Sequence, residues 1–259
     1  MSVVETLRDG AVLTIQINRP ELRNALNEDV ARGIETALDT AESDPDIRAV
    51  VLTGSGDKAF CAGGDLRRTA DGTPFTIDPA QPRHYVARLL RRMDHCHLPL
   101  IARVNGHALA GGMGLVCACD LAVMDQNALI GVTEVKVGLF PAMILPYLLR
   151  MVPPRRVMEL CITGEPVTGA QAAAEGWVNH AVPADHLDTK MDWLLGRIID
   201  KSPTGIRLGK QGLTTIREMT TDSALDYAQF MLANMARTDD VREGFAAFAE
   251  KRKPSWTGR

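Results

Sequence analysis

The sequence is poor in aromatic residues, has little excess charge of either sign, and contains no long apolar run. Aromatic residues make up 5 % of the 259 residues and the formal net charge is −3, so no general attraction to nucleic acid or to an anionic membrane is expected. No run approaches the about 20 apolar residues that a membrane span requires. The first ten residues lack the apolar core of a signal peptide, and we therefore expect a cytoplasmic protein.

The five cysteines do not have the spacing of a disulfide framework or of a zinc site. Their number is odd and no CxxC pair occurs, which is typical of reduced, mostly buried thiols in a reducing compartment. Cys61, beside a glycine turn, is a candidate nucleophile, but no acid is placed to orient a histidine toward it, and a small buried thiol is the simpler interpretation. The DHCH run 94–97 packs its candidate ligands into consecutive residues without a distant partner, so no metal site is predicted.

What the chain does contain is typical of a soluble globular protein, with 46 % apolar and 24 % charged residues. Strand-like and helical segments alternate, which predicts an α/β fold made of right-handed crossover units. The apolar run Ile47–Thr53 predicts a strand buried on both faces. Asn27 is a candidate cap for a helix. The apolar side of that helix, at a 3.6-residue period, consists of Val30, Ile34, Leu38 and Ala41.

Two glycine turns follow strand-like segments. The strand Leu100–Val104 leads into a glycine-rich turn at 105–112 and then a short helical pattern, and a second turn at 59–66 follows the strand that ends at Thr53. The start of a helix leaves backbone N–H groups unpaired and favours negative charge. Two such turns could direct two N–H groups at one oxygen, as in an oxyanion hole. The alternative is that the glycines serve only tight turns and close packing.

The amino-acid sequences of these turns resemble those of a known family. AFCAGGDL (59–66), NGHALAGGMGL (105–115) and TEVKVGLFP (133–141), preceded by NRPELRNALN (18–27), resemble the motifs of the crotonase family, also called the enoyl-CoA hydratase/isomerase family, in the order in which that family has them. The resemblance extends over 12–256. It implies a crotonase-like ββα spiral core at 1–182 and a helical C-terminal region at 183–259, which supports trimers or hexamers in the family. No linker-like stretch separates the two parts, so we expect one fold unit.

The resemblance also implies a reaction centre. The N–H groups of Gly64 and Gly111 match the oxyanion donors that hold a thioester enolate, and Glu134 matches a glutamate that acts as general acid or base at carbon 2 of the acyl chain. Turn glycines and a solvated surface glutamate are the ordinary alternatives. The implied substrate is an acyl-CoA thioester, and no cofactor is expected beyond the coenzyme A that the substrate carries. The positions that match the substrate-binding surface are Arg23, Ala25, Ala62, Asp65, Leu66, Gly114, Phe140 and Pro141.

Several of these positions have a simpler interpretation as well. Arg23 matches a basic residue near the CoA phosphates, although exposed arginines are common. Asp65 could cap the turn that follows it. The basic run 251–253 could reach a CoA phosphate on a neighbouring subunit or could be a solvated tail. The segment 66–83 has little periodicity and several prolines, which predicts a mobile loop; in the resembling family this segment varies and lines the acyl pocket.

Gly114 departs from the family pattern. Hydratases with two glutamates carry the first of them at this position, and here there is no side chain, so we predict room for a larger or polar acyl group. The stretch 133–150, TEVKVGLFPAMILPYLLR, is similar to single-glutamate members such as the bacterial methylglutaconyl-CoA hydratases. We therefore expect reversible hydration of a 2-enoyl-CoA in lipid or fatty acid metabolism. The alternatives are a Δ3,Δ2-enoyl-CoA isomerase, an acyl-CoA or β-diketone hydrolase, or a non-catalytic protein that binds CoA esters or RNA.

Overall fold

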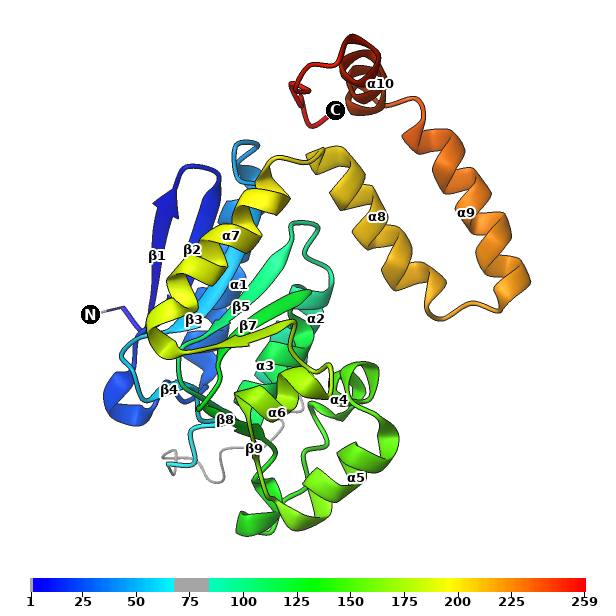
Figure 1. Cartoon of the computed structure of the whole chain (residues 1–259). Helices are drawn as coiled ribbons and strands as arrows, with labels where there is room; N and C mark the ends of the chain where they lie inside the picture. The colour runs from blue at the N-terminus through cyan, green and yellow to red at the C-terminus, as the bar shows by residue number, and fades with distance from the viewer. Residues whose placement is uncertain (1, 68–83) are drawn as a thin grey trace.

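The computed structural model describes residues 2–67 and 84–259, in which two β-sheets are surrounded by helices (Figure 1). The predicted loop at 66–83 therefore lies almost entirely outside the described residues. The larger sheet has the strand order β1 (Val4–Asp9), β2 (Val12–Ile17), β3 (Ala49–Gly54), β5 (Leu100–Val104), β7 (Leu121–Asp125) and β10 (His180–Val182). The smaller sheet has the order β4 (Ala59–Cys61), β6 (His107–Leu109), β8 (Leu129–Gly131) and β9 (Val167–Thr168).

Successive passes of the chain contribute one strand to each sheet. β3 is followed by β4, β5 by β6, and β7 by β8, which winds the chain into a spiral. β4, β6 and β8 pair in parallel, so their carboxyl ends lie at one edge of the smaller sheet. Functional groups of α/β proteins commonly gather beyond such ends. At this edge, β4, β6 and β8 lead into the segments that contain Gly64, Gly111 and Glu134, respectively.

β3 is buried on both faces, as its run of apolar residues predicted, because helices cover the larger sheet on both sides. Successive side chains of a strand point to opposite faces. Val50 and Leu52 belong to the main hydrophobic core, and Ala49 and Val51 belong to a second cluster that includes Leu187 of α7. Figure 1 shows α7 lying across the sheet.

The predicted helix after Asn27 forms as α1. The side chain of Asn27 accepts a hydrogen bond from the N–H of Val30 (2.9 Å), and the predicted apolar side is buried. The helices of the spiral core and the helix that covers its sheet are η1 (Pro20–Leu22), α1 (Glu28–Ser43), α2 (Tyr85–Asp94), α3 (Gly111–Ala118), η2 (Glu134–Val137), α4 (Leu145–Met151), α5 (Pro154–Thr163), α6 (Gly169–Ala174), η3 (Ala184–His186) and α7 (Leu187–Ile199).

The last three helices form an arm that projects from the body of the molecule in Figure 1. They are α8 (Pro203–Ile216), α9 (Thr221–Met235) and α10 (Asp239–Glu250). Large apolar side chains on this arm are exposed, among them Phe230 and Phe248, at 73 % and 86 %. No helix in 2–67 or 84–259 is long and apolar enough to cross a membrane.

Candidate active site

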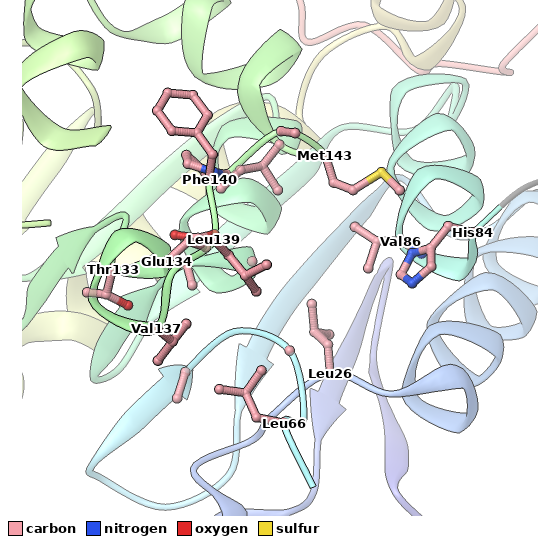
Figure 2. Close-up of a pocket in the computed structure, with 17 residues that line it drawn as sticks. Leu26, Leu66, His84, Val86, Thr133, Glu134, Val137, Leu139, Phe140 and Met143 are labelled. Atoms are coloured by element: carbon pink, nitrogen blue, oxygen red, sulfur yellow. The ribbon is translucent and has the colours of Figure 1, made fainter. Parts of the chain in front are cut away.

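An apolar pocket of about 290 Å³ opens at the carboxyl ends of β4, β6 and β8. Its wall includes Gly64, Gly111 and Glu134, which come from three separate motifs of the sequence. Figure 2 shows Glu134 and Leu139 on one side of this pocket, and Met143 on the opposite side.

The backbone N–H of Gly64 is directed away from its neighbouring chain segment by a parallel bridge to Leu26. The N–H of Leu26 donates to the carbonyl oxygen of Gly63 (2.7 Å), and the N–H of Asp65 donates to the carbonyl oxygen of Leu26 (2.8 Å). The bridge is therefore made by the residues on either side of Gly64. In a parallel bridge of this kind, the N–H of Gly64 itself points away from Leu26. Within 2–67 and 84–259 no acceptor is bonded to the N–H of Gly64, which is thus available to a ligand.

The N–H of Gly111 is available for a different reason. Gly111 is the first residue of α3, where an N–H has no helical carbonyl acceptor. Ala110, just before it, has φ 52° and ψ −123°, an uncommon conformation for a residue with a side chain. Ala110 is fixed there by its own N–H, which donates to the carbonyl oxygen of Gly131 on β8 (2.8 Å).

The two glycine turns are in contact. Gly63 has φ +96°, and a Cβ placed on it would lie 2.7 Å from the Cβ of Ala110 and 3.3 Å from the backbone nitrogen of Gly111. A glycine is therefore required at 63 both for the backbone conformation and for the close approach. The contact brings two available N–H groups to the same wall of the pocket, an arrangement that can hold an oxygen bearing negative charge.

Glu134 is the first residue of η2 and is partly buried at the pocket wall. Burial raises the pKa of its carboxyl group above the ordinary value, and hydrogen bonds from the backbone N–H groups of Glu134 and Thr133 lower it in part. Its Oε2 atom is buried without a hydrogen-bonding partner among the described residues. A partly buried carboxyl group with an unbonded oxygen can take up and release a proton on a bound molecule.

Comparison with known proteins identifies the family to which this chain belongs. The family model described as "Enoyl-CoA hydratase/isomerase" matches residues 8–259. The chain belongs to the enoyl-CoA hydratase/isomerase family. It is 32 % identical over 261 residues to the 2,3-dehydroadipyl-CoA hydratase of Escherichia coli, with all of both chains covered. It is 30 % identical over 252 residues to the short-chain-enoyl-CoA hydratase of Clostridium acetobutylicum, covering 95 % of this chain and 94 % of that one.

The fold agrees with solved structures of the family. The enoyl-CoA hydratase of Mycobacterium smegmatis superposes with a TM-score of 0.91, at 32 % identity and 98 % coverage of each chain. This confirms the crotonase-like α/β fold with its helical C-terminal region that the motifs predicted.

The structure places the predicted substrate-binding residues in two groups. Ala62, Leu66, Phe140 and Pro141 line the pocket. Arg23 is exposed on the neighbouring turn, and Ala25 and Asp65 lie behind the pocket wall, where they contact Arg19. Asp65 also accepts from the N–H of Arg67 (3.2 Å), so it does stabilise the turn that follows it.

The prediction that Gly114 leaves room beside the acyl group is wrong. Gly114 is buried in α3, and a Cβ placed on it would lie 2.3 Å from Cγ2 and 2.8 Å from Cβ of Ile144. Ile144 lines the pocket and Gly114 does not. The space that a glutamate side chain would need is therefore filled by an aliphatic side chain from a distant part of the chain.

We expect Gly114→Glu alone to lower the thermal unfolding midpoint, because overpacking typically costs about 1–3 kcal/mol and a buried carboxyl adds to that cost. Gly114→Glu with Ile144→Ala should recover the part of that loss that comes from overpacking and hydrate crotonyl-CoA faster than Ile144→Ala alone. Thermal unfolding and kcat/KM for the three variants test this. A fully stable Gly114→Glu single variant would contradict the packing argument.

Sequence reasoning missed part of the pocket wall. His84 accepts a hydrogen bond at Nδ1 from the N–H of Val86 (3.3 Å) and so caps α2, and Figure 2 shows it across the pocket from Glu134. A polar residue directly before a helical apolar pattern is a cap signal that could have drawn attention to it. The other residues of the wall that were not predicted are Leu26, Val86, Ala110, Thr133, Val137, Leu139, Ala142, Met143 and Ile144.

The histidines of the 94–97 run and Cys61, which were not predicted to be functional, have structural roles. His97 pairs with Glu42 (2.9 Å), and Nδ1 of His95 lies 2.6 Å from the carbonyl oxygen of Arg91. Cys61 is fully buried, and burial raises the pKa of its thiol to about 12, which keeps it protonated. Across the described ranges, no group of His, Cys, Asp and Glu side chains could hold a metal ion.

Proposed function

We propose that this protein is an enoyl-CoA hydratase that adds water reversibly to the double bond of a 2-enoyl-CoA thioester. One observation carries the proposal: the two available N–H groups of Gly64 and Gly111 and the partly buried carboxyl group of Glu134 line one small apolar pocket. An oxyanion site beside a proton-transfer group is what reaction through a thioester enolate requires. The reaction needs no cofactor beyond the coenzyme A of the substrate.

The proposed reaction conserves atoms and protons with one carboxylate. The carboxylate of Glu134 takes a proton from a bound water while the water oxygen bonds to carbon 3. Electrons of the double bond move to the thioester oxygen, and the N–H groups of Gly64 and Gly111 stabilise that oxygen as an enolate. Glu134 then returns the proton to carbon 2, the carbonyl re-forms, and the carboxylate is restored.

We also propose that the acyl group carries a carboxylate, as in methylglutaconyl-CoA. Two points support this substrate class. The resemblance of the stretch 133–150 to methylglutaconyl-CoA hydratases implies it, and the Escherichia coli relative is named for 2,3-dehydroadipyl-CoA, which bears a carboxylate.

A panel of CoA esters tests both proposals. Crotonyl-CoA and enoyl-CoA esters with and without a terminal carboxylate are incubated with the protein, and the products are weighed by mass spectrometry. Added mass of one water marks hydration, an unchanged mass with a shifted double bond marks isomerisation, and released CoA marks hydrolysis. Either of the last two outcomes as the main reaction would overturn the hydratase proposal. Equal kcat/KM for esters with and without the carboxylate would overturn the substrate class alone.

We propose a homotrimer, or a hexamer of two trimers, as the working assembly. The exposed apolar side chains of the C-terminal arm support this, because contiguous apolar surface on a soluble protein marks an interaction site. The exposed apolar side chains of that arm include Leu213, Leu225, Phe230, Leu232, Phe245 and Phe248. Sedimentation equilibrium measures the assembly directly, and a monomer at micromolar concentration would contradict it.

The raised pKa of Glu134 predicts the pH dependence of hydration. The proposed reaction begins from the carboxylate, and burial makes this form harder to reach. We expect kcat/KM to fall on the acid side with an apparent pKa above the about 4.3 of an ordinary glutamate. Steady-state rates from about pH 4 to pH 8 measure the acid side of this pH–rate profile, and circular dichroism confirms that the protein stays folded. A folded enzyme with constant kcat/KM down to about pH 4.3 would argue against Glu134 as the base.

A further inference from the structure

We propose that Arg19 and Asp65 form a positioning pair that sets the direction of the Gly64 N–H toward the thioester oxygen. This inference rests on the proposed hydratase function. The guanidinium of Arg19 donates to the carboxylate of Asp65 through Nη2 (2.7 Å) and to the carbonyl oxygen of Ala25 through Nη1. Ala25 precedes Leu26, and Asp65 follows Gly64.

The single guanidinium therefore ties together the two segments of the Leu26–Gly64 bridge. That bridge determines which way the Gly64 N–H points. Without Arg19, the segments would be joined there by the two backbone hydrogen bonds of the bridge and by the hydrogen bond from the N–H of Ala62 to the carbonyl oxygen of Arg23 (3.0 Å). A small rotation of the Gly64 peptide would then move its N–H away from the oxyanion position.

Arg19 is itself held firmly. Its backbone N–H donates to Oδ1 of Asn24 (3.0 Å), and its carbonyl oxygen accepts from the N–H of Asn24 (2.9 Å). Asn24 is fully buried with φ 57°, and its Nδ2 donates to the carbonyl oxygens of Ser55 (3.0 Å) and Ala59 (2.7 Å). The pair is thus anchored to the chain between β3 and β4, the same segment that leads into the Gly64 turn.

Most of the surface of both side chains is shielded from solvent. The side chains of Arg19 and Asp65 are 6 % and 12 % exposed. Hydrogen bonds from Arg67 and from Arg19 hold the pKa of Asp65 well below its usual range, despite its burial, so the carboxylate is charged throughout the working pH range. Replacing Asp65 leaves the guanidinium of Arg19 with only the carbonyl oxygen of Ala25 as an acceptor among the described residues, and the local structure must rearrange. Replacing Arg19 leaves Asp65 paired with Arg67 but removes the link to Ala25.

Arg67 provides a matched control on the same carboxylate. It donates to Asp65 through Nη2 (2.7 Å) and Nε (2.9 Å), but its side chain is 64 % exposed. Loss of Arg67 leaves Asp65 still paired with Arg19, and exposed ion pairs contribute little. A purely electrostatic role of the Asp65 neighbourhood would respond to both arginines, whereas a positioning role responds to Arg19.

The first experiment compares Arg19→Lys, Asp65→Asn and Arg67→Gln. We expect Arg19→Lys and Asp65→Asn to lower kcat about 10- to 100-fold, because small displacements of a catalytic donor cost up to about 10²-fold. The Kd for butyryl-CoA, a saturated ester that cannot react, should change little, and Arg67→Gln should keep kcat within about twofold of the unchanged enzyme. Binding stoichiometry with butyryl-CoA gives the active fraction, so partial unfolding is not mistaken for slow turnover.

A double-variant cycle tests whether the pair acts through Gly64. Gly64→Pro removes the N–H, and the bridge does not use that group. If Asp65 acts by positioning the N–H, Asp65→Asn should cost much less in the Gly64→Pro background than in the unchanged enzyme. Full additivity of the two losses, or a folded Arg19→Lys enzyme with unchanged kcat, would overturn the inference. If Arg19→Lys fails to fold, Asp65→Asn and its cycle carry the same test.

Failure of the proposed hydratase function can be distinguished from failure of the positioning role of Arg19 and Asp65. If the unchanged protein hydrates no ester in the panel, the proposed function fails and the positioning role fails with it. If the unchanged protein hydrates and the folded variants turn over at the same rate, the positioning role alone fails.

Discussion

Glu134→Gln is expected to lose most of its hydratase activity while it still binds CoA esters. Glutamine has nearly the same shape but cannot take a proton from water, and general acid–base catalysis by one side chain is worth about 10²–10⁴-fold. Removing a carboxyl group whose pKa is raised by burial should also leave the protein at least as stable. We therefore expect kcat to fall by that factor, with the Kd for butyryl-CoA close to that of the unchanged enzyme.

Glu165→Gln is the matched control. Glu165 lies close to η2 through its ion pair with Lys136 (2.9 Å), but its side chain is 72 % exposed and it does not line the pocket. Its replacement should leave kcat unchanged within about twofold, because exposed ion pairs contribute little. Retention of most activity in Glu134→Gln, or equal losses in the two variants, would rule out Glu134 as the proton-transfer group.

Gly111→Pro is expected to lower kcat by about 10²–10³-fold, the range measured when one oxyanion donor is removed from an enzyme. Proline lacks the N–H and suits the first position of a helix, where Gly111 stands, but it disfavours the backbone conformation of Ala110 before it. Activity measured with crotonyl-CoA, beside thermal unfolding, tests this expectation. A soluble, folded variant with normal kcat would mean that this N–H is not used.

Gly111→Ala separates loss of the donor from added bulk. A Cβ at this position would lie 3.2 Å from Cδ1 of Leu26 and 3.5 Å from the Cα of Gly63, so both substitutions press on the same neighbours. Alanine keeps the N–H. We expect Gly111→Ala to retain much more activity than Gly111→Pro, and similar losses in both would assign the effect to crowding of the pocket.

Much of the local structure could be predicted because its causes lie close together in the sequence. The Asn27 cap and the 3.6-residue apolar period determined α1, and the predicted strand at 100–104 has the observed bounds of β5. The sequence also predicts strands at 120–124 and 128–132, and β7 and β8 differ from these bounds by one residue at each end. Hydrogen-bonding side chains and periodic burial act over a few residues, so they leave a local signal.

The approximate place of the site could also be predicted. The sequence predicted glycine turns after the strands at 47–53 and 100–104, which correspond to β3 and β5 of the larger sheet. The short parallel strands β4 and β6, which lie within those predicted turns and bring Gly64 and Gly111 to the site, were not predicted. The motifs also identified the family, because several of them occur in the family's order along nearly the whole chain.

Other features were decided only by packing between distant segments. Ile144 fills the space beside Gly114 that the sequence left apparently open. Asp65 pairs with Arg19, which is 46 residues away, and therefore lies behind the pocket wall. The direction of the Gly64 N–H depends on a bridge to Leu26. A residue type and its spacing specify which groups are available, but the neighbours of a side chain are set by how whole helices and strands pack, and close packing leaves no space that can be inferred from a missing side chain alone.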